Sequence, residues 1–144
     1  MTETFDLDRF VTAQDRSQTY AAALAELRAG RKRSHWMWFV FPQLEGLGRS
    51  GMADFYALSG PSEARAYLHH PVLGPRLLEC VEALLALDES DPVVVFGHTD
   101  ALKLRSSMTL FVRAAEDPEV RGRFVAVLER YYAGSEDPLT VARL

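Results

Sequence analysis

The residues with the clearest chemical potential lie in one run of the sequence, RKRSHWMWFVFPQL, from Arg31 to Leu44. This run contains three consecutive cations, a histidine, a glutamine and both tryptophans of the chain. Arginine binds phosphate through charge-assisted, forked hydrogen bonds, and a tryptophan that stacks on a nucleotide base contributes about 1–3 kcal/mol. The pattern therefore predicts an anion and base pocket, with the candidate ligand-binding residues Arg31, Arg33, His35, Trp36, Trp38 and Gln43.

The aromatic residues of this run are also typical core anchors, because each buries about 150–250 Å². The segment from Trp36 to Phe41 has no clear period, so it predicts either a buried helical turn or a short extended piece that ends at Pro42. In that interpretation the basic residues form a solvated helix exit, which the helix dipole favours. The burial of Trp36 and Trp38 separates the two interpretations.

A second group of polar residues lies on a helix predicted from Ala101 to about Ala115. Lys103 and Ser107 are one helical turn apart and Ser106 lies beside them, so the three form a polar stripe almost opposite the apolar face. A lysine and two hydroxyls in a cleft are candidates to bind phosphate, carboxylate or sugar oxygens. The alternative is a solvated face whose serines bond to backbone carbonyls. Leu110 lies within the stripe, which indicates that this side is at least partly covered.

Two carboxylates, Glu63 and Asp100, are candidate catalytic residues. Glycosidic bonds are commonly cleaved by a pair of carboxyl groups that act as acid and base. Each of the two residues also falls at the start of a predicted helix, where negative charge is favourable without any catalysis. The sequence leaves both interpretations open, and with them the question of whether the protein is an enzyme.

Motifs for metals and cofactors are missing from the sequence. It has no HExxH, no Asp-rich loop, and no GxxxxGK[ST], GxGxxG or GxSxG pattern. Cys80 is the single cysteine, which excludes an intramolecular disulfide and disfavours a cysteine-based zinc site. We therefore expect neither a metal nor a cofactor.

The size and charge of the chain restrict the class of protein. Its 144 residues fit one helical domain, residues 1–144, and its net charge of −4 disfavours nucleic acid as a partner. No apolar run approaches the roughly 20 residues that cross a bilayer. The segment from Met1 to Asp6 lacks the pattern of a signal peptide. We therefore expect a cytoplasmic protein that does not contact membranes.

Helical periodicity dominates the rest of the sequence. Apolar residues recur at helical spacing in segments that we place at about 18–29, 75–87, 101–115 and 119–132. Pro61 suits the first turn of a further helix, at about 61–69, which His70-Pro71 breaks. The one β-rich run, from Val93 to Phe96, is too short to form a sheet alone. The sequence predicts an all-α fold, a single compact multihelical domain of about six to eight helices with no significant sheet.

The order of several motifs resembles a known family. The motifs are HWMWFVFPQL followed by GLG, then EARAYL, HPVLGPRL and KLRSSMTLF. Over nearly the whole chain this order is similar to that of a bacterial family, domain of unknown function 1810, whose members are sometimes labelled calpastatin. The resemblance implies a compact multihelical domain and no established activity. It also suggests a shared polar site, because the family's motif residues here include Arg31, Lys32, His35, Gln43, Glu63, His70, Arg76, Asp100, Lys103, Ser106, Ser107 and Thr109.

Our first functional hypothesis is a site for a small phosphorylated nucleoside or an ADP-ribose-like molecule. Arg31, Arg33 and Lys103 would neutralise phosphate. Trp36 or Trp38 would stack on the base, and Gln43 would recognise a polar edge of the ligand. The enzymatic version adds N-glycosidic hydrolysis by Glu63 or Asp100. A weaker similarity to helical domains that process ADP-ribose and related N-glycosides supports this hypothesis by analogy.

The second hypothesis is a non-catalytic interaction or regulatory module, with a homodimer as one version. The tryptophans and Met37 would then form an exposed apolar patch of several hundred Å². Full burial of both tryptophans would remove both the patch and the stacking wall.

Overall fold

Helices form nearly all of the regular structure in residues 4–144, the part of the chain that this computed structural model describes. Within these residues no strand forms, although Leu44 and Leu58 make an isolated parallel β-bridge. The all-α prediction is confirmed. Residues 1–3 belong to the segment analysed for a signal peptide and lie outside the described residues. The elements in chain order are α1 (Asp8–Asp15), a 3-10 turn (Arg16–Gln18), α2 (Thr19–Arg28), α3 (Met37–Val40), α4 (Gly51–Phe55), α5 (Pro61–His69), α6 (Leu73–Ala86), α7 (Pro92–Phe96), α8 (His98–Ala114), α9 (Pro118–Tyr132) and α10 (Pro138–Ala142).

The observed helices match the predicted ones where the apolar periodicity is long. The segments expected at about 18–29, 75–87, 101–115 and 119–132 correspond to α2, α6, α8 and α9, and their ends agree within three residues. The short helix α3 decides the open question about Trp36 to Phe41 in favour of a helical turn. The helix α4 was not predicted, because five residues that begin with glycine carry too little periodicity to indicate a helix.

Three helices begin with the same dipeptide, Asp-Pro. Asp91, Asp117 and Asp137 precede α7, α9 and α10, and each carboxylate accepts a hydrogen bond from a backbone N–H of the following turn, at 2.9, 2.9 and 3.0 Å. Proline suits the first helical position because its missing N–H would have had no partner there. The Asp137 cap fixes where α10 starts, which matters for the site described below.

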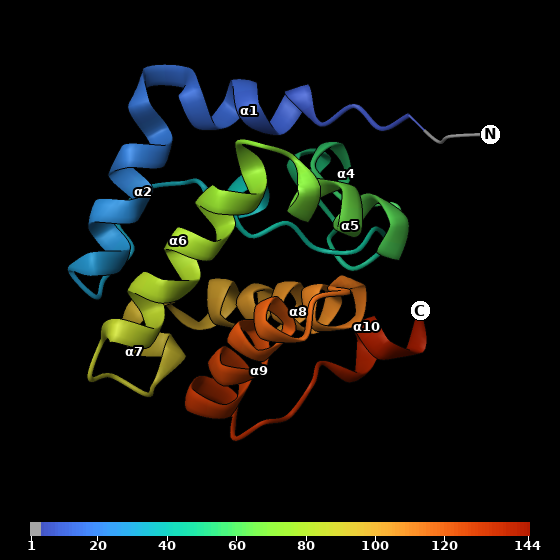
Figure 1. Cartoon of the computed structure of the whole chain (residues 1–144). Coiled ribbons are helices and arrows are strands. Elements are labelled where there is room, and N and C mark those ends of the chain that lie inside the picture. The colour runs from blue at the N-terminus through green and yellow to red at the C-terminus, as the bar shows by residue number, and fades with distance from the viewer. Residues whose placement is uncertain (1–3) are drawn as a thin grey trace.

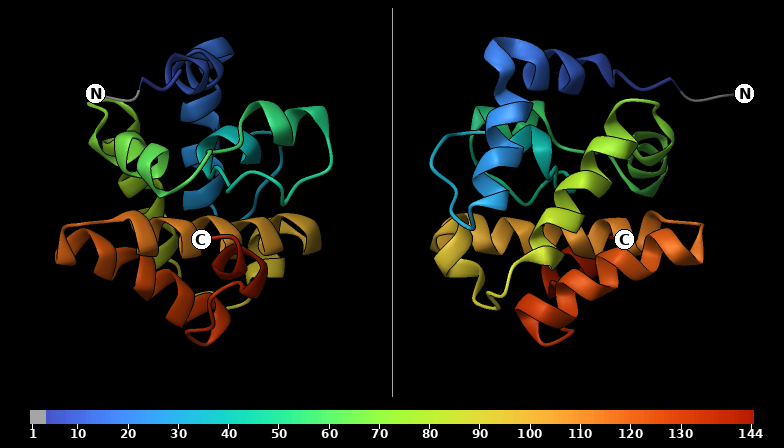
Figure 2. Two further views of the ribbon diagram at one scale, coloured as in Figure 1. Left: turned by 90° about the vertical axis from the view of Figure 1, so that its right-hand side faces the viewer. Right: turned by 60° about the vertical axis from the view of Figure 1, so that its left-hand side comes forward.

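The helix α8 occupies the centre of the fold. It lies between the group formed by α1 to α6 and the pair α9 and α10, as the views in Figures 1 and 2 show. It packs against α5 and α9. All six residues from 106 to 111 are buried. The central position of α8 explains why polar residues in its middle, such as Ser106, Ser107 and Thr109, are buried.

Aromatic side chains form the core beside α8. Phe10, Tyr67, Phe111 and Phe124 are fully buried, and the successive ring centroids in this series are 5.2, 5.6 and 5.5 Å apart. Such pairs contribute about 0.5–1.5 kcal/mol each beyond their buried area. Among the described helices, none has both the length and the apolar composition needed to cross a bilayer.

Candidate functional site

Both lysines and both tryptophans of the chain meet around Asp100, in the first turn of α8. The Lys32 ammonium lies 2.9 Å from Asp100 Oδ2, and the Lys103 ammonium lies 3.6 Å from Asp100 Oδ1. Lys32 also lies over the ring of Trp36 and Lys103 over that of Trp38, each 5.1 Å from the ring centroid. A cation at this distance is attracted to an indole face. The five residues therefore form one electrostatic unit, which we call the Asp100 cluster.

Trp36 is a core residue within this cluster. Its side chain is fully buried, and its ring centroid lies 6.2 Å from that of Phe41 and 6.5 Å from that of Phe96. The indole Nε1 donates a hydrogen bond of 3.0 Å to Glu26 Oε1, so the polar atom of the ring is also satisfied. A ligand cannot stack on Trp36 in this conformation, and its role is to anchor the loop that carries Lys32.

Glu26, at the end of α2, organises that loop. Its carboxylate accepts hydrogen bonds from Arg33 N, Ser34 N, Ser34 Oγ and Trp36 Nε1, at 2.6, 3.0, 2.6 and 3.0 Å. Burial alone would raise the pKa of Glu26, but the four hydrogen bonds outweigh it and lower the pKa from 4.5 to about 2. Lys32 closes the loop by donating to Ser34 O at 2.6 Å. The loop is therefore held by a carboxylate that is ionised at neutral pH.

A groove of about 280 Å³ lies beside Lys103, between α8, the loop at residues 43–48 and α10. Trp38 is half-buried, and the ammonium of Lys103 covers part of its ring. Gln43 and Lys103 line both this groove and a hollow of about 10 Å³ next to Trp38, which is no larger than one water requires. The other residues that line the groove, which we call the Lys103 groove, are Leu47, Gly48, Thr99, Leu102, Ser106, Asp137 and Leu139.

Polar contacts from α8 hold α10 in place as one wall of the Lys103 groove. Ser106 Oγ donates to Asp137 Oδ2 at 3.0 Å, and Asp137 N donates to Thr109 Oγ1 at 2.9 Å. Arg113 makes a forked ion pair with Glu136, with N···O distances of 2.9 and 2.7 Å, and this pair lowers the pKa of Glu136. Ser106, Thr109 and Arg113 of α8 therefore fix the position at which α10 starts.

The serines of the predicted polar stripe are both buried, as the position of Leu110 indicated. Ser106 lines the Lys103 groove through its contact with Asp137. Ser107 is fully buried away from the groove, and its hydroxyl has no hydrogen-bond partner among the residues that the structure describes. The solvated-face alternative is wrong for the two serines, because both lie in the buried stretch of α8 at residues 106–111.

The structure does not bring the remaining predicted residues to the Lys103 groove. Arg31, Arg33 and His35 are exposed on the loop before Trp36 and do not line the groove. Glu63 is buried at the start of α5, where its carboxylate accepts a hydrogen bond from Ser59 N at 2.8 Å and pairs with Arg9 at 3.2 Å.

Glu63 and Asp100 are therefore held by separate partners. Asp100 pairs with Lys32 and Lys103, whereas Glu63 pairs with Arg9. The assignment of the two carboxylates as an acid/base pair stays a prediction.

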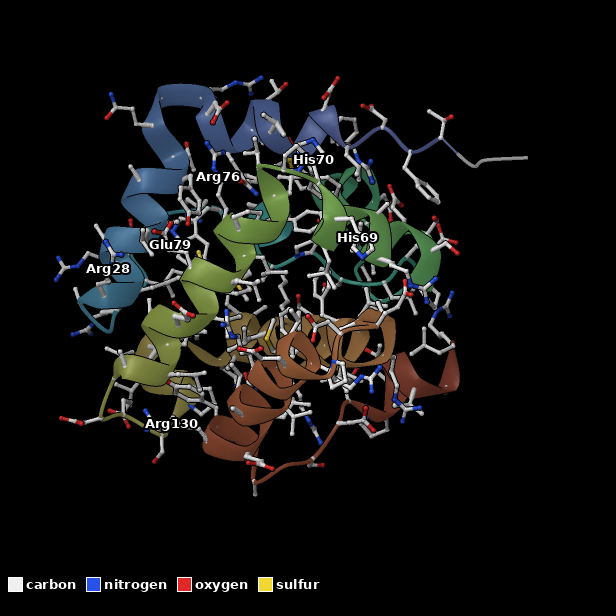
Figure 3. The ribbon with its side chains drawn as sticks, viewed as in Figure 1. Arg28, His69, His70, Arg76, Glu79 and Arg130 are labelled. Atoms are coloured by element: carbon white, nitrogen blue, oxygen red, sulfur yellow. The ribbon has the colours of Figure 1, made fainter. Side chains whose placement is uncertain are left out.

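A larger hollow of about 340 Å³ lies between α2 and α6, where Arg28 lies beside Glu79 (Figure 3). The ion pair between Arg28 and Glu79 is long, at 3.8 Å, and their side chains are 63% and 47% exposed. Exposed pairs of this kind stabilise little and hold no fixed geometry. Within the described residues, no group of three or more His, Cys, Asp or Glu side chains could hold a metal ion. We therefore place the candidate site at the Lys103 groove.

Three contributors to this region were not predicted as ligand-binding or catalytic residues: Glu26, Asp137 and Lys32, of which only Lys32 was included in the polar site that the family resemblance suggests. The signal for Asp137 was its position before a proline, which indicates a helix cap but not a groove. The composition distinguishes Lys32, since the chain has only two lysines beside fourteen arginines. Nothing in the local sequence distinguishes Glu26 from the other acidic residues of the chain.

Comparisons with known proteins agree with this architecture. The model of a family described as "Protein of unknown function (DUF1810)" matches residues 4–144. The crystal structure of the conserved hypothetical protein Rv1873 from Mycobacterium tuberculosis is similar, with 52% sequence identity and a TM-score of 0.92. The similarity covers 99% of this chain and 98% of that one. No curated protein matches the chain. Because the family model matches almost every residue, the protein belongs to the DUF1810 family.

Proposed function

We propose that the protein binds a small phosphorylated nucleoside or an ADP-ribose-like molecule in the Lys103 groove. The observation that carries this proposal is the position of Lys103, whose half-buried ammonium lines the groove beside Gln43 and makes only a 3.6 Å contact with a carboxylate. A lysine with remaining donors at the edge of a groove is a typical phosphate ligand.

The rest of the groove fits the other parts of such a ligand. The side chains of Leu47, Leu102 and Leu139 give it an apolar rim on which a base can lie. The amide of Gln43 supplies both a donor and an acceptor for a polar edge. Asp137 adds a carboxylate, a group that commonly accepts hydrogen bonds from ribose hydroxyls. Ligand pockets typically combine an apolar lining with a few polar groups in this way.

We do not extend the proposal to N-glycosidic hydrolysis. Glu63 is engaged by Arg9 and Ser59, and Asp100 is engaged by Lys32 and Lys103. A glycosidase requires two carboxyl groups on either side of one scissile bond, and neither of these carboxylates lines the Lys103 groove.

Binding can be tested by calorimetry and by thermal-shift measurements with AMP, ADP-ribose and NAD at low salt. We expect stabilisation of the wild-type protein, and a loss of affinity of at least about tenfold in Lys103→Met, the range for a hydrogen bond to a charged group. Arg31→Met is the matched control, because Arg31 carries the same charge but lies outside the groove. No binding at millimolar concentrations, or an equal effect of both substitutions, would contradict the proposal.

The interaction-module alternative has one supporting observation. An exposed patch built from Trp36 and Met37 does not form, because both side chains are buried. On α4, however, Met52 and Phe55 are 42% and 57% exposed and give a different apolar surface. Light scattering of wild type and Phe55→Ser would test it. A monomer at high concentration removes the homodimer version of this alternative.

A further inference from the structure

We propose that Asp100 is a built-in counter-ion of Lys103, which an incoming anion must displace, and that the site therefore selects ligands that end in a phosphate monoester. The inference rests on the proposed function and concerns how the same groove chooses its ligand.

The two contacts of Asp100 are unequal. The shorter one joins Oδ2 to Lys32 at 2.9 Å, and the Lys32 side chain is only 9% exposed. The longer one joins Oδ1 to Lys103 at 3.6 Å, and the Lys103 side chain is 23% exposed. Lys32 is also fixed by Ser34 O and by the face of Trp36. Lys32 can therefore keep Asp100 neutralised while Lys103 turns toward a ligand.

The presence of a lysine, not an arginine, at position 103 favours exchange at that contact. The chain uses arginine at fourteen of its sixteen strongly basic positions, and its two lysines are the residues that pair with Asp100. Arginine would grip the carboxylate through a rigid fork, whereas a lysine ammonium is a point charge on a flexible stem. Among the described residues, Asp100 is the one carboxylate that forms an ion pair with Lys103.

An exchange of anions at Lys103 is favourable only when the incoming group attracts the ammonium more strongly than the Asp100 carboxylate does. A phosphate monoester carries a charge of about −1.5 to −2 at pH 7, against −1 for a carboxylate. Each phosphate of a pyrophosphate that links two nucleosides carries one charge, as in NAD. The competition therefore favours a mononucleotide over a dinucleotide, although both classes would fit a groove with a single cation.

The test is a comparison of AMP and NAD affinities by calorimetry at low salt. We expect AMP to bind wild type more tightly than NAD. Asp100→Asn removes the competing charge, so it should tighten AMP binding by about two- to fivefold, the range for one partly exposed ion pair, and it should tighten NAD binding at least as much. Lys32→Met leaves Asp100 to Lys103 alone, so it should weaken AMP binding.

The matched control is Asp88→Asn, which removes the same charge at an exposed position of the α6–α7 loop and should leave both affinities unchanged. Weaker AMP binding in Asp100→Asn, or equal tightening in the control, overturns the inference while the proposed function stands. If wild type binds none of AMP, ADP-ribose and NAD, the proposed function and this inference both fail, whereas binding of ADP-ribose without AMP overturns the inference alone. Thermal melts confirm folding of each variant, and Asp100→Asn decides alone if Lys32→Met does not fold.

Discussion

The carboxylate of Glu26 should be a major source of stability, and Glu26→Gln tests this. The substitution keeps the size of the side chain but removes the charge that accepts four hydrogen bonds from the loop at residues 33–36. A fall in pKa from 4.5 to about 2 corresponds to about 3 kcal/mol at 1.36 kcal/mol per pKa unit. Because the carboxylate is partly exposed, solvent screening reduces this, and we expect a loss of about 2 kcal/mol at pH 7.

The pH dependence of the Glu26 effect has a definite sign. The folded-state pKa of Glu26 lies below its unfolded value, so the folded protein stabilises the ionised form. The contribution is complete above the unfolded pKa of 4.5 and is lost as the pH falls through the folded pKa of about 2. The difference in unfolding free energy between wild type and Glu26→Gln should therefore be largest at neutral pH, shrink below pH 4.5 and nearly vanish near pH 2.

Urea denaturation at several pH values measures this difference, with tryptophan fluorescence as the probe, to which Trp36 and Trp38 both contribute. The matched control is Glu129→Gln, because Glu129 is exposed and makes no hydrogen bond or ion pair with the described residues. At neutral pH the expected loss corresponds to a decrease of roughly 4–8 °C in Tm for a chain of this size. Equal stability of Glu26→Gln and Glu129→Gln at pH 7, or a difference that does not change with pH, would refute the reasoning.

Three further predictions concern buried positions, and thermal or chemical denaturation checks the first two. Ser107→Ala should raise the unfolding free energy by about 1 kcal/mol, because it removes a buried hydroxyl that has no partner among the described residues; a destabilised variant would indicate an unseen partner. Gly74→Ala should destabilise the protein by more than about 1 kcal/mol, since its Cβ would lie 2.1 Å from Leu68 O, a backbone atom that cannot move freely; Gly122→Ala, where a Cβ meets open space, should be neutral or stabilising. Cys80 should not react with a thiol reagent in the folded state, because burial excludes the reagent and raises the pKa of the thiol to about 12; labelling in native buffer as fast as in urea would contradict this.

The fold was predictable from the sequence because its long helices carry their own periodic signal. In α6, for example, Leu77, Val81 and Leu84 recur at helical spacing and are all buried. The short elements lacked such a signal. The four residues of α3 show no clear period in the sequence, and the helical turn that they form lies beside the packed rings of Trp36, Phe41 and Phe96.

The candidate site was predictable only in part, because its geometry depends on contacts between distant segments. Lys103 and Gln43 were identified from residue type, and both line the groove. Arg31 and Arg33 were predicted to bind phosphate, yet neither lines the groove. Arg31 and Arg33 are exposed, whereas the lysine between them points inward to Asp100. Alternation of this kind cannot be derived from a loop sequence, since a loop has no fixed period that assigns a face to each residue.

The two lysines have different roles because their side chains differ in burial, and the local sequence does not show which of the two is the more buried. Both residues are cations near a tryptophan and near Asp100, so residue type alone would give them the same role. Lys32 is fixed on every side, by Asp100, Ser34 O and Trp36, and therefore serves the structure. Lys103 has a looser contact and a groove beside it, which leaves its charge available to a ligand. Lys32→Met, which removes the charge but keeps most of the side-chain volume, should thus lower stability and ligand affinity together. Lys103→Met should lower ligand affinity far more than stability.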